Sequence, residues 1–417
     1  MSSETTQNEQ ILRKRIDFIN DLGVVGERRL IGLVSSAIDS RLIEPDASGQ
    51  HGLGAKIAGT SGTGKSHTLE CCKKVQDLSS FVSISTASQK SIVYQEDSWK
   101  NKAVIFAEAL NLQRKSDSDL VYHLRTLLSE GVVTHHVTTK VGGEFVTKSQ
   151  TIEGPISLIT TTTVESLESQ LESRLVTISP DESSQQTKLI LQKTAKIAAN
   201  GSAADNAERI KAWQNFHRDL KPARIVIPFA EKVVKAIVSG VSLPIPARRS
   251  FKQLLDLVKA VTIFYQAQRK SDESGQIVAE IADYHMAYQI LSENFEEGIS
   301  SQSDASRERL DFIMKSGNPL KINDMMQEFG ISKNGVSKFL KRFVKDGFVK
   351  WCNSDGQPFE TDTALKKAKY AGRAFIAARS AGTQSSATLL PNAYEITGDE
   401  AWKDGGELTQ QYDLALD

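Results

Sequence analysis

The spacing of hydrophobic residues divides the first half of the chain into short apolar runs separated by amphipathic segments. Five runs have the length of buried strands, and they cover residues 55–58, 81–85, 103–107, 156–160 and 175–178. Helical spacing is present from Ile11 to about Leu42 and again in residues 119–130, where leucines recur three and four positions apart. Short apolar strands that alternate with helices are typical of a parallel sheet covered on both faces. The pattern therefore predicts an α/β fold with a five-stranded parallel sheet.

A different pattern precedes the fourth of these runs. Residues 133–141 and 144–151 are rich in threonine and valine and flank the dipeptide Gly142-Gly143. Two β-prone segments on either side of a Gly-Gly turn indicate a β-hairpin. The sequence thus predicts a hairpin inserted into the sheet domain.

The second half of the chain changes character. Residues 185–297 carry helical spacing and predict a helical lid, and residues 306–380 predict a winged helix-turn-helix of three helices and a strand. From Tyr394 to Asp417 seven acidic residues stand against one lysine, a net charge of −6. We expect five parts: a disordered N-terminus at 1–10, an α/β core at 11–184, the lid, the winged helix, and a flexible acidic tail at 381–417.

A glycine-rich motif lies between the first strand and the helix that follows it. Residues 59–66 read GTSGTGKS, which matches the phosphate-binding pattern G-x-x-x-x-G-K-[ST]. Its glycines let backbone N–H groups turn toward a phosphate, and the positive end of the following helix adds to that field. Lys65 would reach the β- and γ-phosphates, and the Ser66 hydroxyl would hold Mg²⁺. We expect the nucleotide-binding residues to be Gly59, Thr60, Ser61, Gly62, Thr63, Gly64, Lys65, Ser66 and His67.

Composition adds limits on partners and location. The 417 residues include 51 basic and 51 acidic side chains, so any nucleic-acid surface must be a local patch. The three cysteines have neither disulfide nor metal-ligand spacing, and no apolar stretch approaches 18 residues. The N-terminal decapeptide is polar, unlike a secretory signal. We expect a cytoplasmic protein that does not enter a membrane.

An acidic residue follows the third predicted strand. Residues 104–106 read Val-Ile-Phe, and Ala107-Glu108 comes directly after them, where related folds place an Asp-Glu pair. A carboxylate at this point orients the attacking water or contacts Mg²⁺ in phosphoryl transfer. Glu108 is therefore the candidate water-orienting and metal-contacting residue. An exposed glutamate at a strand end is the alternative.

Taken together, these motifs resemble those of AAA+ ATPases over roughly residues 15–295. The order of the strands and the hairpin before the fourth strand are similar to the pre-sensor-1 hairpin group, which contains the minichromosome maintenance and superfamily 3 helicases. Residues 23–27 (GVVGE), residues 122–131 (YHLRTLLSEG) and Glu153-Gly154-Pro155 are similar to the AAA+ domains of primase-helicase proteins of phages and mobile elements. No primase motif is present in this sequence, so a primase or an initiator would be a separate partner.

The resemblance assigns roles to four further residues. Thr162 and Thr163 match the position of sensor 1, a polar residue that detects the γ-phosphate, although most relatives outside this subgroup have asparagine there. Arg174 matches the arginine finger that reaches the ATP of the neighbouring subunit, and Arg249 matches sensor 2. A planar guanidinium suits the charge that spreads over a transferred phosphoryl group. The alternative for each of these arginines is a solvated surface residue with no catalytic role.

Two clusters of basic residues are candidates for binding DNA. Lys140 and Lys148 lie on the hairpin, where they would contact the phosphates of a single strand in a ring channel or else protect a sheet edge from aggregation. The predicted winged helix carries six basic residues against one acidic residue over positions 333–350, a net charge of +5. Its candidate duplex contacts are Lys333, Lys338, Lys341, Arg342 and Lys345. Winged helices also bind proteins, which is the alternative.

The sequence therefore predicts a ring-forming ATPase, expected to be a homo-hexamer, that moves along or unwinds DNA in the replication of a phage, prophage or mobile element. ATP and Mg²⁺ are the expected cofactors. One alternative is an origin-binding initiator or helicase loader in which ATP acts as a switch. Another is a DNA-binding regulator whose oligomeric state depends on nucleotide and which has no motor activity.

Overall fold

The computed structural model describes residues 10–45, 52–84, 99–106, 119–141, 144–163, 167–200, 206–238, 247–299, 309–310, 312–313, 316, 318–345, 349–359, 374–377 and 390–416. Contacts divide the chain into two compact units. The first unit contains Met1–Ala230, Arg249–Asn294 and Asn392–Asp417, and the second contains Glu231–Arg248 and Phe295–Pro391.

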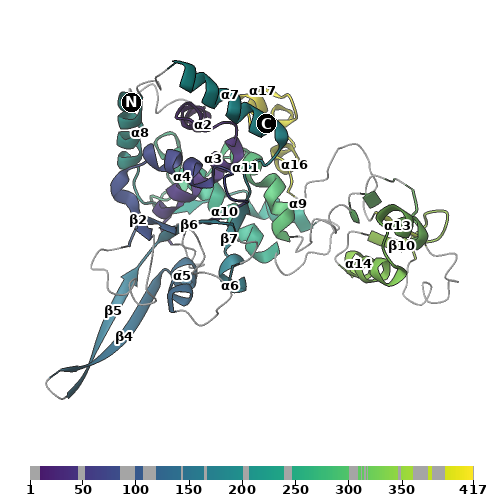
Figure 1. Ribbon diagram of the computed structural model, residues 1–417, viewed down its shortest axis with the longest axis horizontal. Helices are drawn as coiled ribbons and strands as arrows, with labels where there is room; N and C mark the ends of the chain where they lie inside the picture. The colour runs from purple at the N-terminus through teal and green to yellow at the C-terminus, as the bar shows by residue number, and fades with distance from the viewer. Residues whose placement is uncertain are drawn as a thin grey trace. The chain divides into compact units, whose positions relative to one another are not determined.

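A five-stranded parallel sheet forms the centre of the first unit (Figure 1). Its strand order is β2-β3-β6-β1-β7. The bounds are β1 Gly54–Ala58, β2 Phe81–Ile84, β3 Lys102–Phe106, β6 Ile156–Thr162 and β7 Leu175–Ile178. All five predicted strands are confirmed to within two residues at each end. The central strands β3, β6 and β1 are buried on both faces, including the polar residues Lys56 of β1 and Ser157 of β6.

Helices cover both faces of the sheet. The first-unit helices are α2 (Ile11–Asp21), α3 (Arg28–Asp39), α4 (Lys65–Lys74), α5 (Asp119–Glu130), α6 (Ser169–Glu172), α7 (Ser184–Asn200), α8 (Ala207–Asp219), α10 (Ala247–Phe264) and α11 (Ile281–Ile299, whose last residues belong to the second unit). Helix α5 packs Leu124 and Leu127 against Val104 and Leu158 on one face of the sheet. Helix α3 lies against β1 and β6. Helices α7 and α8, and α10 from Arg249 onward, belong to the same compact unit as the sheet.

The predicted hairpin is present as a two-stranded antiparallel ribbon of β4 (Val132–Val141) and β5 (Glu144–Glu153). It forms a separate two-stranded sheet, and Figure 1 shows β4 and β5 as two long strands that lie side by side. The ribbon begins and ends at the amino edge of the main sheet, because Gly154, just before β6, donates its N–H to the Gly131 carbonyl oxygen at 2.6 Å. A second small sheet pairs β8 (Ile225–Val226) with β9 (Ile277–Val278) in parallel.

The expectation of a flexible acidic tail is wrong for its last part. Residues 392–416, which we call the C-terminal strap, form α16 (Ala393–Thr397), a 3-10 turn at Glu400–Trp402 and α17 (Glu407–Gln411). Buried or half-buried apolar residues are spaced between the acidic ones, and together with the start of α11 they form a small core: Ile281, Ala282, Ala393, Tyr394, Trp402, Leu408 and Tyr412. Net charge alone therefore gave the wrong result, because these apolar side chains supply enough buried surface to fold the strap.

Hydrogen bonds fix the end of the strap to the helices beneath it. The Gln289 side chain donates to the Tyr412 carbonyl oxygen at 2.9 Å and accepts from the Leu414 N–H at 2.8 Å. Arg28, the first residue of α3, donates to the Leu414 carbonyl oxygen at 3.1 Å. The strap thus joins α11 to the start of α3.

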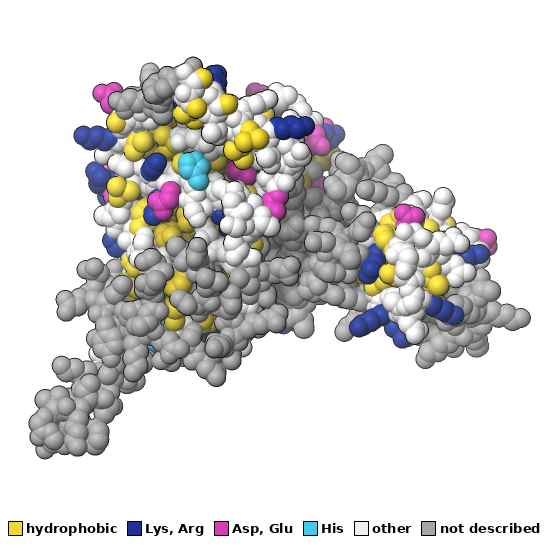
Figure 2. Space-filling model, in the orientation of Figure 1, with side chains coloured by type: hydrophobic (Ala, Val, Ile, Leu, Met, Phe, Trp, Pro, Cys, Tyr) yellow, Lys and Arg dark blue, Asp and Glu magenta, His cyan; other side chains and the backbone are white. Residues whose placement is uncertain are grey.

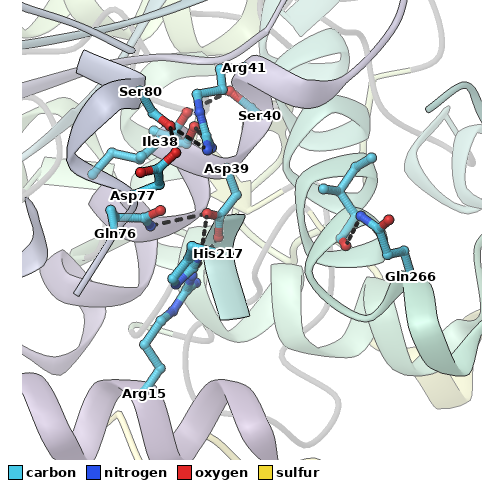
Figure 3. Close-up of polar contacts among 12 residues, drawn as sticks. Arg15, Ile38, Asp39, Ser40, Arg41, Gln76, Asp77, Ser80, His217 and Gln266 are labelled. Carbon is cyan, nitrogen blue, oxygen red and sulfur yellow. Dashed lines mark hydrogen bonds and ion pairs between the residues drawn. The ribbon is translucent and has the colours of Figure 1, made fainter. Parts of the chain in front are cut away.

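A buried ion pair ties three helices together near the N-terminus (Figure 3). Arg15 of α2 donates to the Asp39 carboxylate of α3 at 2.5 Å, and both side chains are fully buried. The same carboxylate accepts from the Gln76 amide at 3.1 Å and lies 3.4 Å from the His217 Nδ1 of α8. Burial opposes ionisation, but Arg15 and His217 outweigh it and hold the pKa of Asp39 well below its usual range.

The second unit contains α9 (Ala230–Val238), α13 (Ile322–Phe329), α14 (Lys333–Lys345) and an antiparallel pair of β10 (Val349–Cys352) with β11 (Ala374–Ala377). Two helices and the two-stranded sheet enclose a core that includes Met325, Val336, Leu340, Phe343 and Phe375. Helix α14 begins at Lys333, because the Ser332 hydroxyl accepts from the Gly335 N–H at 3.3 Å and caps the helix.

Candidate nucleotide site

The glycine-rich motif forms the loop between β1 and α4. Gly62 and Gly64 have φ angles of 87° and 85°, in the left-handed region. A Cβ at either position would meet no atom within 4 Å, so glycine is required there by backbone conformation and not by space. Gly64 is the N-cap of α4, and the first turn of the helix therefore points its N–H groups toward the loop. This is the geometry of an anion site at a helix N-terminus.

The Lys65 side chain is buried within the loop. Its ammonium group donates to the carbonyl oxygens of Gly59 at 2.8 Å and Thr60 at 2.5 Å. The Thr63 hydroxyl also donates to the Thr60 carbonyl oxygen, at 3.0 Å. The loop's own backbone thus holds a positive charge at the start of α4, where a phosphate would be the stronger, charged acceptor.

Strand β6 places the sensor 1 candidates beside this loop. The β1–β6 register pairs Ala58 with Thr162, and the Gly59 N–H donates to the Thr162 carbonyl oxygen at 3.2 Å. Thr162 is buried and Thr163 is exposed. Thr162 is the last residue of β6 and Thr163 follows it, so both lie at the carboxyl end of a central strand, which is where parallel α/β sheets bind ligands.

Of the two candidate residues for contacting Mg²⁺ and orienting water, Ser66 is among the described residues and Glu108 is not. The last described residue before Glu108, Phe106, pairs with Thr160 of β6 at the carboxyl edge. Ser66 is exposed on the first turn of α4. Among described residues there is no group of three or more His, Cys, Asp or Glu that could enclose a metal. Mg²⁺ in nucleotide sites is held by one or two protein oxygens together with phosphates, so the Ser66 hydroxyl fits that use.

The structure adds residues that the sequence did not reveal. Glu182, in the turn before α7, accepts from the Thr60 N–H at 2.8 Å and from the Thr60 hydroxyl at 3.2 Å. The buried Gln186 amide donates to the Val25 carbonyl oxygen at 2.5 Å and to the Glu27 carboxylate at 3.3 Å. Burial raises the pKa of Glu27. No sequence motif surrounds Glu182 or Gln186, so the sequence could not indicate them. Residues 23–27, in contrast, were already part of the resemblance to AAA+ domains.

The two candidate arginines lie together but away from the phosphate loop of their own chain. Arg174 precedes β7 and donates to the Ser129 hydroxyl at 2.5 Å, and Arg249 of α10 donates to the Ser173 hydroxyl. This is the amino edge of the sheet, where Leu175 pairs with Gly54. From Gly54 to the loop is the length of β1, about 13 Å at the usual rise per residue. Within one chain, the structure brings the arginines to each other and not to the phosphate site.

The basic DNA candidates lie in both units. In the hairpin the register pairs Lys140 with Phe145 and Lys148 with Val137, and the side chains of these residues lie outside the described set. In α14, three candidates have exposed side chains: Lys333, Lys338 and Lys341. The side chains of the other two, Arg342 and Lys345, lie outside the described set.

A five-stranded parallel sheet whose first strand leads through a glycine-rich loop into a helix defines a P-loop domain, the class of fold that binds nucleotide phosphates. Comparison with family models agrees: residues 3–221 match the MTBMA_p00010 P-loop domain, and the chain belongs to that family. No curated protein matches the chain. Among the described residues, no helix is both long and apolar enough to cross a membrane.

Proposed function

We propose that this protein is an ATPase of the AAA+ type whose catalytic site is completed by a neighbouring copy. The observation that carries this proposal is the separation of the Arg174–Arg249 pair from the phosphate loop, at opposite edges of one sheet. Arginines placed in this way serve hydrolysis only when a second copy presents them to the loop. A closed ring, with a hexamer as the expected form, satisfies that requirement for every copy.

Within one such site the roles follow from the chemistry of phosphoryl transfer. Lys65 leaves the carbonyl oxygens of the loop and neutralises the β- and γ-phosphates, while Ser66 offers its hydroxyl to the metal. Bound Mg²⁺ would neutralise charge on the β- and γ-phosphate oxygens. Glu108 orients the attacking water, and Thr162 or Thr163 contacts the γ-phosphate. Arg174 from the neighbour stabilises the charge of the transferred group.

The segment formed by residues 23–27 and the start of α7 is proposed to receive the adenine base. Gln186 fixes the Val25 carbonyl oxygen and the Glu27 side chain, and Glu182 fixes Thr60 at the beginning of the loop. These contacts hold backbone polar groups in place beside the phosphate site. Preorganised polar groups of this kind set base orientation and specificity.

We further propose that the ring is a DNA translocase or helicase that acts in the replication of a phage, prophage or mobile element. The hairpin lysines would contact single-stranded DNA in the channel, and helices α13 and α14 with the β10–β11 pair would act as a winged helix on duplex DNA. The exposed lysines of α14 support this second role. Helices α7 to α11 correspond to the lid of the AAA+ resemblance, and a primase or initiator would be a separate partner.

ATP turnover by the full chain, with and without single-stranded DNA, tests this function. We expect turnover that depends on Mg²⁺, rises with DNA and disappears in Lys65→Ala, with strand displacement on a forked duplex. Stimulated turnover without displacement would favour the initiator or loader, in which ATP is a switch. Negligible turnover combined with tight sequence-specific duplex binding would favour a nucleotide-dependent regulator and refute the motor.

A further inference from the structure

Helix α7 exposes an unusual amount of apolar surface. Among the described residues of the helix only Gln186 is fully buried, and nearly all the others are exposed. Four large aliphatic side chains are more than 40% exposed: Leu189 at 41%, Ile190 at 41%, Leu191 at 63% and Ile197 at 44%. In Figure 2 hydrophobic side chains lie at the surface where Figure 1 places α7. Contiguous apolar surface of this kind marks an interaction site more often than scattered single residues do.

Polar contacts fix this helix beside the nucleotide site. Its N-terminal turn is held by Gln186, and farther along Lys193 donates to the carbonyl oxygens of Asn20 at 2.8 Å and Val24 at 2.9 Å. The preceding residue Glu182 contacts Thr60 in the phosphate loop. Leu191 is about two and a half helical turns, roughly 14 Å along the chain, from Glu182. The apolar face is a fixed part of the nucleotide edge of the molecule.

The same edge carries an acidic rim. Asp181 and Glu182 are exposed and lie between the phosphate loop and α7. The Asp181 N–H donates to the Glu27 carboxylate at 3.0 Å, so a third carboxylate lies beside them. Burial raises the pKa of Glu27, as expected for a carboxylate grouped with others and lacking a cation. Within the described part of the chain, Glu27, Asp181 and Glu182 form no salt bridge.

A complementary surface lies at the amino edge of the sheet. Arg125 donates to the Gln170 side chain at 2.6 Å, Arg174 to Ser129, and Arg249 to Ser173, so all three donate to neutral oxygen atoms. Within the described residues none of the three arginines forms an ion pair. Burial lowers the pKa of Arg174, and the nearby Arg249 and Arg125 lower it further, more than counterbalancing the neighbouring glutamates. Next to this arginine face, Tyr122 is 55% exposed, 5.5 Å from the Arg125 guanidinium.

We propose that the apolar face of α7 and its acidic rim bind the arginine face and Tyr122 of a second copy of this chain. The two surfaces are opposite in charge, each carries exposed apolar area, and they lie at opposite edges of the sheet. Such a contact is head-to-tail, and repeated with rotation it closes a ring. This inference rests on the proposed function, because it is the contact that delivers Arg174 to the neighbour's phosphate loop. It adds that α7 supplies the binding energy of the interface.

Replacement of one exposed leucine tests this directly. Leu191→Asp places a charge on the most exposed of the four aliphatic side chains of α7, and Leu78→Asp is the matched control. Leu78 is 62% exposed and lies in the 3-10 turn Leu78–Ser80 before β2, at the far edge of the sheet from β7. Both variants are measured by light scattering with Mg²⁺ and the non-hydrolysable analogue AMP-PNP. Binding of fluorescent mant-ADP to each variant at a concentration where it is monomeric reports whether the nucleotide site is intact.

We expect the wild type and Leu78→Asp to assemble alike, and Leu191→Asp to need at least a roughly tenfold higher concentration, as for the loss of one well-buried apolar contact in an interface. Its mant-ADP affinity should remain within about twofold of the wild type, since Leu191 does not touch the phosphate loop. Assembly of Leu191→Asp at the wild-type concentration overturns the interface, and the shared ATP site would then be formed through another surface. A wild-type protein that hydrolyses ATP while it remains monomeric would also refute the interface, but it would support the assignment of ATPase activity.

Discussion

Protonation of His285 should release the C-terminal strap. His285 is buried on α11 with its ring 5.2 Å from that of Trp402, the tryptophan of the strap. Burial lowers the pKa of His285 from 6.5 to about 4, although Asp413 and Asp404 oppose this change. That gap corresponds to about 3 kcal/mol of preference for the neutral imidazole while the strap is docked.

The sign of the pH dependence follows from this lowered pKa. When the strap is undocked, His285 has its higher pKa and therefore binds a proton more tightly than it does when the strap is docked. Docking is fully stabilised above pH 6.5 and is weakened progressively as the pH falls from 6.5 to about 4. At pH 5.0 the loss amounts to about 2 kcal/mol, or roughly a 30-fold increase in the undocked fraction.

Hydrogen exchange followed by mass spectrometry measures this opening. Peptides from residues 392–416 should lose protection by roughly 30-fold between pH 7.5 and 5.0, after correction for intrinsic exchange rates, while peptides from α3 and β6 keep theirs. His285→Gln removes the titrating group and should show little dependence on pH over the same interval. Equal strap protection at the two pH values in the wild type, or an unchanged pH dependence in His285→Gln, would refute this reasoning.

Three further variants test other parts of the structure. Gly64→Ala should weaken nucleotide binding by roughly 5- to 30-fold in titration calorimetry, because its left-handed backbone costs a non-glycine residue about 1–2 kcal/mol; unchanged affinity would mean that the loop tolerates another conformation. Asp39→Ala should lower the free energy of unfolding by about 3–5 kcal/mol in urea titration, because it leaves Arg15 charged and buried; a loss below about 1 kcal/mol would show that the pair contributes little. Changing Lys140 and Lys148 together to Ala should reduce the salt slope of single-strand binding by roughly 0.7 for each DNA phosphate that the lysines no longer neutralise, and an unchanged slope would remove the hairpin from the DNA path.

Much of the sheet could be predicted because its central strands, β3, β6 and β1, are buried on both faces. Residues 104–106 are a continuous apolar run, and residues 156–159 are apolar apart from Ser157; such segments are typical of strands inside a covered sheet. The phosphate loop was also predictable, since glycine, lysine and serine at fixed spacing reflect local backbone geometry. Both features depend on residues that are close together in the sequence.

The parts that could not be predicted depend on contacts between distant segments. Glu182 meets Thr60 across 122 positions, and nothing around either residue indicates that they are neighbours. The strap was mistaken for a flexible tail because its charge is visible in the sequence, whereas the packing of Trp402 against His285 is not. The grouping of Arg174 with Arg249 likewise follows from the fold, since α10 approaches the start of β7 only in the folded chain.

The central claim is that each ATP site is shared between two copies, and a mixing experiment tests it most directly. Lys65→Ala keeps the arginine face and lacks a working phosphate loop, whereas Arg174→Ala keeps the loop and lacks the finger. Each variant alone should hydrolyse ATP at a small fraction of the wild-type rate, with Arg174→Ala reduced by on the order of 10³ if the arginine acts as a finger. An equimolar mixture should recover roughly a quarter of the wild-type rate, because one interface in four of a randomly mixed ring joins an intact loop to an intact finger. Mixed assemblies that show no recovery, or full activity of Arg174→Ala alone, would contradict the shared site.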